Sequence, residues 1–194
     1  MSQQTENVRT RRTRKLLREA LIDLIEERGF DRLTVAEITD RGMVSRAAFY
    51  RNYRDKFHLV EQIFDEAMGE LVGTMSDDSG KTTQERWIDF FEHISDYHRL
   101  YGALLGRNGS PWFANKMRST LSEMVKEHLT IPDVTLPAAP GRKPATGLVP
   151  TILGATFVQA ITWWLENDRP NPPRDIAMQT AQIAAAIIKE ANEW

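Results

Sequence analysis

The sequence predicts an all-α protein in two parts, residues 1–55 and residues 56–194. Apolar residues recur every three or four positions over long stretches, which is the spacing of one face of an α-helix. The two parts also differ in charge: residues 1–56 hold 13 Lys and Arg against 9 Asp and Glu, and the remainder holds 12 against 18. A basic head joined to an acidic body suits a protein that presents one end to a polyanion.

The composition excludes several classes of protein. The chain has no cysteine, which excludes disulfides and cysteine metal sites and is compatible with a reducing cytoplasm. The N-terminus lacks the apolar segment of a signal peptide, and no apolar run approaches the roughly 20 residues that span a bilayer. We therefore expect a soluble, cytoplasmic protein without membrane contacts.

The first helix is expected to follow a disordered start, residues 1–8, and a dense basic run. The run consists of Arg9, Arg11, Arg12, Arg14 and Lys15. Apolar pairs then recur every four residues from Leu16 to Ile25, and Gly29 ends the helix. The basic run is either a solvated tail or a phosphate-binding segment.

Two short helices around a tight turn are predicted between Thr34 and Lys56. Thr34 and Glu37 have the spacing of a capping box, in which each side chain satisfies an otherwise unpaired backbone N–H. Gly42 can take a positive φ and so ends this helix with a sharp turn, and Ser45 offers the N-cap of the next helix. The arrangement predicts a helix-turn-helix, whose second helix lies in the DNA major groove, although an ordinary helical hairpin has the same spacing.

The second of these helices, residues 45–53, carries Ala48 and Phe49 as apolar positions, while its hydrogen-bonding side chains can face outward. Those side chains are Arg46, Tyr50, Arg51 and Asn52. Asp55 is then the expected N-cap of a long connecting helix. The first turn of that helix would place Lys56 and the helix N-terminus beside a phosphate of the DNA backbone.

The C-terminal part is predicted to begin with an aromatic helix and a second amphipathic helix. The aromatic helix runs from Trp87 to Leu105 after a polar break at residues 76–83, and the next helix begins near Pro111. Residues 130–146 contain four prolines, so they are predicted to form a mobile loop.

The last two helices, from Leu148 to Leu165 and from Ile176 to Trp194, are apolar on more than one face. They cannot bury all of that surface against a single core, so a partner surface is implied. A second copy of the chain would complete a four-helix bundle about a two-fold axis. The interface residues expected on this basis are Ile161, Ile183, Ala184, Ile187 and Ile188. The alternative is that both helices are buried within one monomer.

Aromatic and methionine side chains in the C-terminal part predict a pocket for an effector. The expected wall comprises Trp87, Phe91, Ile94, Tyr97, His98, Tyr101, Phe113, Met117, Met124, Phe157 and Trp164. Such side chains adapt to the shape of an apolar or aromatic ligand. The same residues at helical spacing also form ordinary cores, and this alternative stays open.

At residues 45–63 the sequence resembles the TetR family of bacterial transcriptional regulators, whose recognition helix commonly reads S-x-x-x-(F/Y)-Y-x-x-(F/Y)-x-x-K-x-x-L. Residues on that pattern are Ser45, Phe49, Tyr50, Tyr53, Lys56 and Leu59, and the preceding half is matched by Thr34, Val35, Ile38 and Val44. The C-terminal part resembles the branch of the family that includes activators of dihydroxyacetone kinase genes.

The resemblance implies an all-α dimer that binds double-stranded DNA. The residues near bases or phosphates would be Thr34, Ser45, Arg46, Ala47, Tyr50, Arg51, Asn52, Tyr53 and Lys56. The family usually has glycine where this chain has Met43, so either the turn is shifted by one residue or Met43 is strained. Ala48 stands where the family frequently has threonine, and Asn52 stands where histidine is common. These differences affect which operator sequence is expected to be recognised.

The sequence therefore predicts a one-component regulator that binds a pseudopalindromic operator as a homodimer, with recognition helices about 34 to 36 Å apart. An effector in the C-terminal domain would shift that separation. The regulator would act either as a repressor or as an activator of transcription. One alternative is a regulator that uses its C-terminal face only for protein contacts. Another is a helical enzyme or metal protein, but no histidine pair or catalytic constellation stands out, so we expect no catalytic residue, metal or cofactor.

Overall fold

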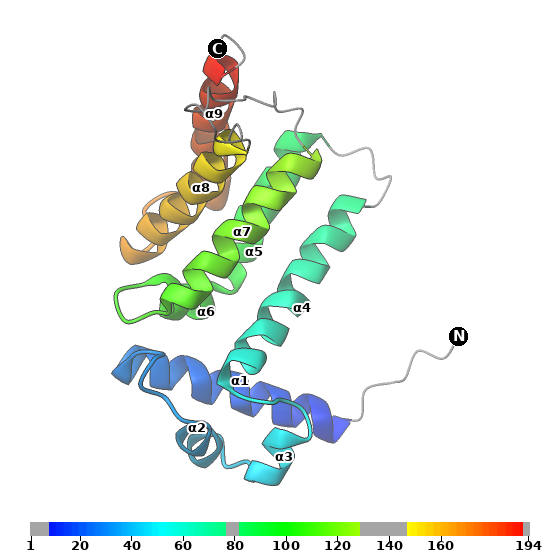
Figure 1. Cartoon of the computed structure of the whole chain (residues 1–194), viewed down its shortest axis with the longest axis vertical. Helices are drawn as coiled ribbons and strands as arrows, with labels where there is room; N and C mark the ends of the chain where they lie inside the picture. The colour runs from blue at the N-terminus through cyan, green and yellow to red at the C-terminus, as the bar shows by residue number, and fades with distance from the viewer. Residues whose placement is uncertain (1–7, 77–81, 129–146, 192–194) are drawn as a thin grey trace, which may run out of the picture. The chain divides into compact units, whose positions relative to one another are not determined.

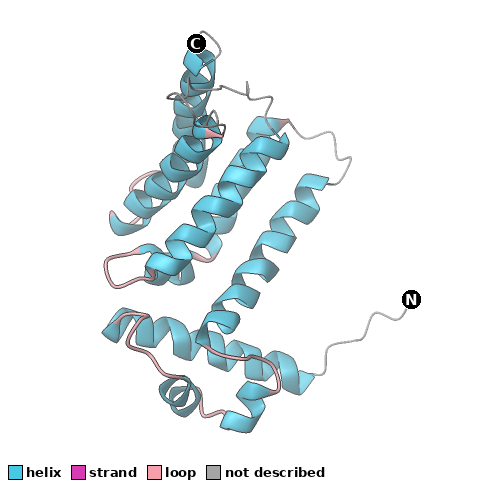
Figure 2. Cartoon of the chain, viewed as in Figure 1, coloured by secondary structure: helices cyan, strands magenta, loops and turns pink. Residues whose placement is uncertain are grey.

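The computed structural model describes residues 8–76, 82–128 and 147–191, which form α-helices and connecting loops without a β-strand (Figure 1; Figure 2). The predicted all-α fold class is confirmed. The helices are α1 (Val8–Arg28), α2 (Val35–Arg41), α3 (Arg46–Tyr50), α4 (Lys56–Ser76), α5 (Thr83–Asp96), α6 (His98–Leu105), α7 (Pro111–His128), α8 (Leu148–Glu166) and α9 (Pro173–Ala191). The predicted proline-containing loop at residues 130–146 lies outside the described residues, as do residues 1–7 and most of the predicted break at residues 76–83.

The chain divides into two compact units. The first comprises residues 1–77 with residues 107–110 and contains α1 to α4, and the second comprises residues 78–106 with residues 111–194 and contains α5 to α9. The sequence-based boundary at residue 55 falls before α4, whereas the structure groups this helix with the head. The assignment of separate functions to the two parts stays a prediction.

In the first unit, α1 supplies one side of the core. Leu17, Leu21 and Ile25 lie four residues apart on this helix, and all three are fully buried. Ile38 of α2, Phe49 of α3 and Leu59 of α4 are also fully buried, so each helix contributes to the core of this unit. Gly29 ends α1 with a φ of +80°, as predicted. The helix begins at Val8, so its first turns include the basic run.

The aromatic segment of the second unit forms two helices, α5 and α6, where the sequence predicted one. They meet at Tyr97, which has a φ of -102° and a ψ of 24°. The Nδ1 atom of His98 lies 2.9 Å from the carbonyl oxygen of Ser95. This ring thus bonds to the carbonyl that a continuous helix would offer to the N–H of residue 99, at the point where α5 ends.

The core of the second unit is built around α8, which contacts α6, α7 and α9. By length and composition alone, α8 is the one helix of the described ranges that could cross a membrane, which corrects the expectation that no apolar run approaches that length. Here its apolar side chains are used for packing. The buried ones are Val149, Leu153, Phe157, Val158, Ile161 and Trp164.

Candidate nucleic-acid interface

Thr34 begins α2 with the predicted capping box. Its hydroxyl oxygen accepts a hydrogen bond from the Glu37 N–H at 3.3 Å and donates one to Glu37 Oε2 at 2.8 Å. The Thr34 N–H donates to the same carboxylate oxygen at 2.9 Å. These bonds from Thr34, assisted by Arg28, hold the pKa of Glu37 below its ordinary value. The Thr34 hydroxyl thus has a structural role in starting the helix.

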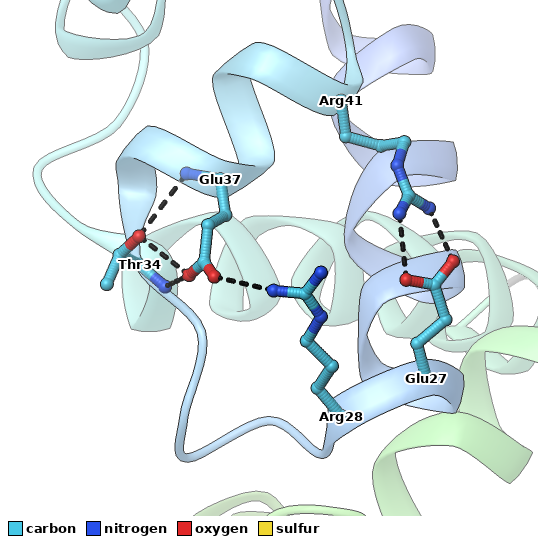
Figure 3. A network of polar contacts seen from close by, with 5 residues as sticks. All are labelled: Glu27, Arg28, Thr34, Glu37 and Arg41. Atoms are coloured by element: carbon cyan, nitrogen blue, oxygen red, sulfur yellow. Dashed lines mark hydrogen bonds and ion pairs between the residues drawn. The ribbon is translucent and has the colours of Figure 1, made fainter.

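Two ion pairs hold α2 against α1 (Figure 3). Arg28 Nη1 donates to Glu37 Oε1 at 3.0 Å, so the capping carboxylate also receives a cation from the end of α1. The guanidinium of Arg41 forms two parallel bonds with the carboxylate of Glu27, both 2.8 Å. Hydrogen bonding to Arg41 lowers the pKa of Glu27. The pairs join opposite ends of α2 to α1 and so fix its orientation.

The turn between α2 and α3 differs from the prediction at Gly42. Its φ is -75°, in the right-handed region, and the positive φ of +50° belongs to Met43. A Cβ atom on Gly42 would lie 3.2 Å from the carbonyl oxygen of Ile38 and 3.3 Å from that of Leu16. A side chain at Gly42 would therefore be crowded between α1 and α2, and the strained residue of the turn is Met43.

The exposed face of α3 carries basic, small and aromatic side chains. The Ser45 hydroxyl caps the helix by accepting from the Ala48 N–H at 3.2 Å, as predicted. The exposed residues of this face are Ser45, Arg46, Ala47, Tyr50 and Arg51. Tyr50 is the bulkiest of them, with 58% of its surface exposed. The arrangement presents hydrogen-bond donors and an aromatic ring on one side of a short helix.

Two residues next to this face that were predicted to contact DNA also make contacts within the head. Tyr53 is buried, with its ring centroid 5.4 Å from that of Phe49 and 6.1 Å from that of His58. Asn52 Nδ2 donates to the carbonyl of Ala48 at 2.8 Å. The i, i+4 spacing that places Tyr53 below Phe49 explains its burial, so we assign both side chains to positioning α3.

The bonding of Lys56 also differs from what was predicted, which was a contact with a phosphate. Its Nζ atom donates to the carbonyls of Phe30, Asp31 and Leu33, each at 2.9 Å. An ammonium group has three N–H donors, so none is left for a phosphate. Burial lowers the pKa of Lys56, and the carboxylates of Asp31 and Glu37 oppose that shift. The acceptors lie 23 to 26 residues earlier in the chain, where no local pattern signals them.

Two residues of the basic run, Arg14 and Lys15, and the nearby Arg18 form ion pairs within the unit. Arg14 and Arg18 pair with the carboxylate of Glu66 in α4 at 3.1 and 3.2 Å. Lys15 lies 3.9 Å from Glu19. Some arginines of this unit keep exposed side chains that have no ion-pair partner among the residues with described positions. They are Arg12, Arg32, Arg46, Arg51 and Arg54.

The predicted effector-pocket residues form an aromatic core in the second unit. Phe91, Ile94, Tyr101, Phe113, Met117, Phe157 and Trp164 are buried, and Trp87, Tyr97, His98 and Met124 are half-buried. Ring centroids of Trp87 and Phe157 lie 4.3 Å apart. His93, which was not predicted as part of this group, places Nε2 at 3.1 Å from the Tyr101 hydroxyl. Burial raises the pKa of that hydroxyl.

The predicted dimer residues do not share one exposed face. Ile161 and Ala184 are buried within their own unit, which corrects their assignment, because α8 and α9 turn these positions toward the core. Ile187 and Ile188 are half-buried, and Ile183 is 51% exposed. Trp163, which was not predicted, is 46% exposed. The sequence did contain a signal that one of these tryptophans is exposed. Trp163 and Trp164 are adjacent, and neighbouring helix positions cannot both face one core.

A capped helix-turn-helix whose second helix exposes arginines and a tyrosine defines a DNA-binding protein of the helix-turn-helix class. The sequence profile described as "Bacterial regulatory proteins, tetR family" matches residues 17–63. The profile described as "Transcriptional regulator C-terminal region" matches residues 81–185, more than half of the chain. The chain belongs to the TetR family and is a transcriptional regulator.

Two relatives match most of this chain. The HTH-type transcriptional activator FasR of Mycolicibacterium smegmatis is 27% identical over 179 residues, which cover 85% of this chain and 78% of FasR. The uncharacterized HTH-type transcriptional regulator YxbF of Bacillus subtilis is 26% identical over 179 residues, covering 87% of this chain and 44% of YxbF. The chain thus spans less than half the length of YxbF.

Solved TetR structures have the same fold. A TetR regulator from Streptococcus agalactiae superposes with a TM-score of 0.63 at 19% identity, covering 91% of this chain and 95% of that one. The dihydroxyacetone kinase operon activator DhaS has a TM-score of 0.54 at 14% identity, and the match covers 91% of this chain and 96% of DhaS. Bacillus subtilis FadR, in complex with stearoyl-CoA, superposes with a TM-score of 0.54 at 16% identity. The match covers 90% of this chain and 97% of FadR. At these identities the likeness shows the fold alone.

Proposed function

We propose that this chain binds a pseudopalindromic operator in double-stranded DNA as a homodimer and so controls transcription in the bacterial cytoplasm. The observation that carries the proposal is the exposed face of α3, which presents Arg46, Tyr50 and Arg51 to solvent. The ion pairs and caps that hold α2 support the proposal, because they keep this face in a fixed orientation.

Each exposed group of the head suits one kind of DNA contact. Arg46, in the first turn of α3, can reach the O6 and N7 acceptors of a guanine in the major groove. Arg51 and Arg54, at the end of α3 and beyond it, suit phosphate oxygens, which fix the register on the duplex. We assign Tyr50 to a base edge or phosphate. The phosphate contacts would make binding strongly dependent on salt.

The test is selection of DNA fragments from a randomised duplex library by the purified protein, followed by titration of the selected duplex at two salt concentrations. We expect an inverted repeat with half-sites about one helical turn apart, or a multiple of it. The double variant Arg46→Ala and Arg51→Ala should lose the selected sequence while keeping its helical content. Enrichment of no sequence, or of a single half-site without symmetry, would contradict the proposal.

The homodimer is proposed to form through exposed apolar residues of α8 and α9. Ile152, Trp163 and Ile183 are large apolar side chains that the second unit leaves exposed. We expect Trp163→Asp to convert a dimer into a monomer in light scattering, because a charge cannot be buried without a partner. Ser119→Asp, at an exposed position of α7, is the matched control and should leave the dimer intact. A monomeric wild-type chain would contradict this part of the proposal.

We further propose that a small apolar or aromatic effector binds among the aromatic side chains of the second unit. Two features support it: this core contains a cluster of aromatic rings with Met117 beside aliphatic side chains, and FadR of the same fold was crystallised with stearoyl-CoA. The half-buried Trp87, Tyr97 and Met124 are the side chains through which a ligand would enter.

Thermal denaturation across a panel of ligands tests the effector. The panel includes stearoyl-CoA, shorter acyl-CoA esters and aromatic carboxylic acids, with free CoA as the control. A compound that raises the Tm in proportion to its concentration and also changes operator affinity supports the proposal. If no compound changes either quantity, the alternative is favoured, in which the C-terminal face serves protein contacts only.

A further inference from the structure

Met43 is an outlier in the turn of the helix-turn-helix. Its φ of +50° lies in the left-handed region, which residues with a Cβ adopt at a cost and glycine adopts freely. Its side chain is 89% exposed, so it contributes almost nothing to the core. Neither the backbone conformation nor internal packing favours methionine here, and backbone strain of this kind tends to occur at functional sites.

The turn holds Met43 in place. The Met43 N–H donates to the carbonyl of Asp40 at 3.2 Å, and the Val44 N–H donates to that of Thr39 at 2.9 Å. Ser45, two residues later, caps α3, so the strained residue lies three positions before Arg46, the first residue of the recognition helix. In helix-turn-helix proteins the residues of this first turn contact base edges, so an exposed apolar side chain this near to them in the chain is a candidate to reach the same groove.

We propose that the Met43 side chain contacts the 5-methyl group of a thymine in each operator half-site and so adds a base preference. The inference rests on the DNA binding proposed above. The thymine methyl is the apolar group on the major-groove edges, whereas the other base-specific features there are hydrogen-bond donors and acceptors. Arg46 is assigned to base acceptors, and the thioether of methionine is flexible and polarizable enough to pack on a methyl group.

Replacement of thymine by deoxyuridine in the selected operator tests the contact, because it removes only the methyl group. For the wild-type protein we expect one thymine per half-site at which the replacement weakens binding about fourfold, the factor for burial of one methyl-sized group. For Met43→Ala and Met43→Gly the same replacement should have no effect. Met43→Leu, which keeps an apolar side chain, should retain the sensitivity.

The three variants separate the side chain from the backbone. Met43→Ala keeps the energetic cost of the positive φ but loses the contact with thymine. Met43→Gly removes both the cost and the contact. If the two variants lose their sensitivity to the thymine methyl equally, the effect belongs to the side chain. Circular dichroism of each variant shows that the head remains helical. If the wild-type protein selects an operator whose deoxyuridine forms bind as well as the parent, the contact is refuted while DNA binding stands. If the wild-type protein selects no operator, both proposals are refuted.

Discussion

The ammonium of Lys56 donates a hydrogen bond to the main-chain carbonyl of Phe30 at 2.9 Å and lies 4.7 Å from the centroid of the Phe30 ring. It donates to the carbonyls of Asp31 and Leu33 at the same distance. These carbonyls belong to the loop between α1 and α2, so the first residue of α4 closes that loop. The contact makes Lys56 a structural residue of the head.

Lys56→Met should therefore lower the free energy of unfolding by about 1 to 3 kcal/mol, because it removes three hydrogen bonds and takes the ammonium donor from the partly buried carbonyl of Leu33. Urea denaturation followed by circular dichroism measures this. Lys15→Met is the matched control: Lys15 is exposed and its ion pair with Glu19 is 3.9 Å, so its change should stay within about 0.5 kcal/mol. A phosphate-binding role for Lys56 would instead predict unchanged stability and a salt dependence of DNA binding reduced by about one charge.

Acid should destabilise the head through Glu27 and Glu37. The pKa of each carboxyl is held below its ordinary value of 4.5, mainly by Arg41 and Thr34 respectively. The unfolded chain therefore binds protons first as the pH falls. The stability contributed by each group is present above pH 4.5 and is lost as the pH falls below this value through the folded-state pKa.

Thermal denaturation of the wild-type protein and of Glu27→Gln between pH 7 and pH 3 tests this prediction. The difference between the two proteins isolates the contribution of Glu27 from that of the other carboxylates. At neutral pH the wild type should have the higher Tm, and the two curves should converge as the pH falls below 4.5 through the folded-state pKa of Glu27, because a protonated carboxyl resembles an amide. Glu37→Gln should behave in the same way. A Tm difference that is constant over the whole range would contradict the role given to these ion pairs.

The parts of the head that the sequence predicted are those fixed by neighbours in the chain. The capping box of Thr34 and Glu37 and the N-caps at Ser45 and Asp55 act over three residues, so their spacing is visible in the sequence. The acceptors of Lys56 and the bidentate pair of Glu27 with Arg41 depend on how helices pack. No periodicity signals them.

The faces of α8 and α9 could not be assigned from the sequence for a related reason. A helix that is apolar nearly all round buries one side in its own unit, and periodicity does not say which side. Ile161 and Trp163 are two positions apart, yet the first is buried and the second is exposed. For the turn, the sequence left two alternatives, a shift by one residue or strain at Met43, because glycine serves both positive φ and close approach. The φ of -75° at Gly42 and of +50° at Met43 shows that the second applies.

Tyr50 and Tyr53 should respond oppositely to substitution. Tyr50→Ala should weaken operator binding by about 1 to 3 kcal/mol and change stability little, because the ring is mostly exposed. Tyr53→Ala should instead lower the free energy of unfolding by roughly 3 kcal/mol or more, because the ring is buried against Phe49. Electrophoretic shift and urea denaturation measure the two quantities. If Tyr50→Ala lost as much stability as Tyr53→Ala, the proposal that Tyr50 contacts DNA while Tyr53 packs in the core would be refuted.

Gly154→Ala should destabilise the second unit by about 1 to 3 kcal/mol. A Cβ at this position of α8 would lie 2.8 Å from the carbonyl oxygen of Arg118 in α7, and backbone cannot move aside cheaply. Gly102→Ala in α6 is the matched control, because no atom lies within 4 Å of its added Cβ. That variant should gain about 0.5 to 1 kcal/mol from helix propensity. Equal effects of the two substitutions in thermal denaturation would contradict the close packing of α7 on α8.

Met43→Gly should raise the free energy of unfolding by about 1 kcal/mol, because glycine adopts the φ of +50° without the clash that a Cβ introduces. Met43→Ala keeps that clash and loses a side chain that packs on nothing, so its stability should stay within about 0.5 kcal/mol of the wild type. Urea denaturation of the three proteins checks the order. Destabilisation by glycine would show that the methionine side chain stabilises the turn, and the strain would then need no function in DNA recognition to explain it.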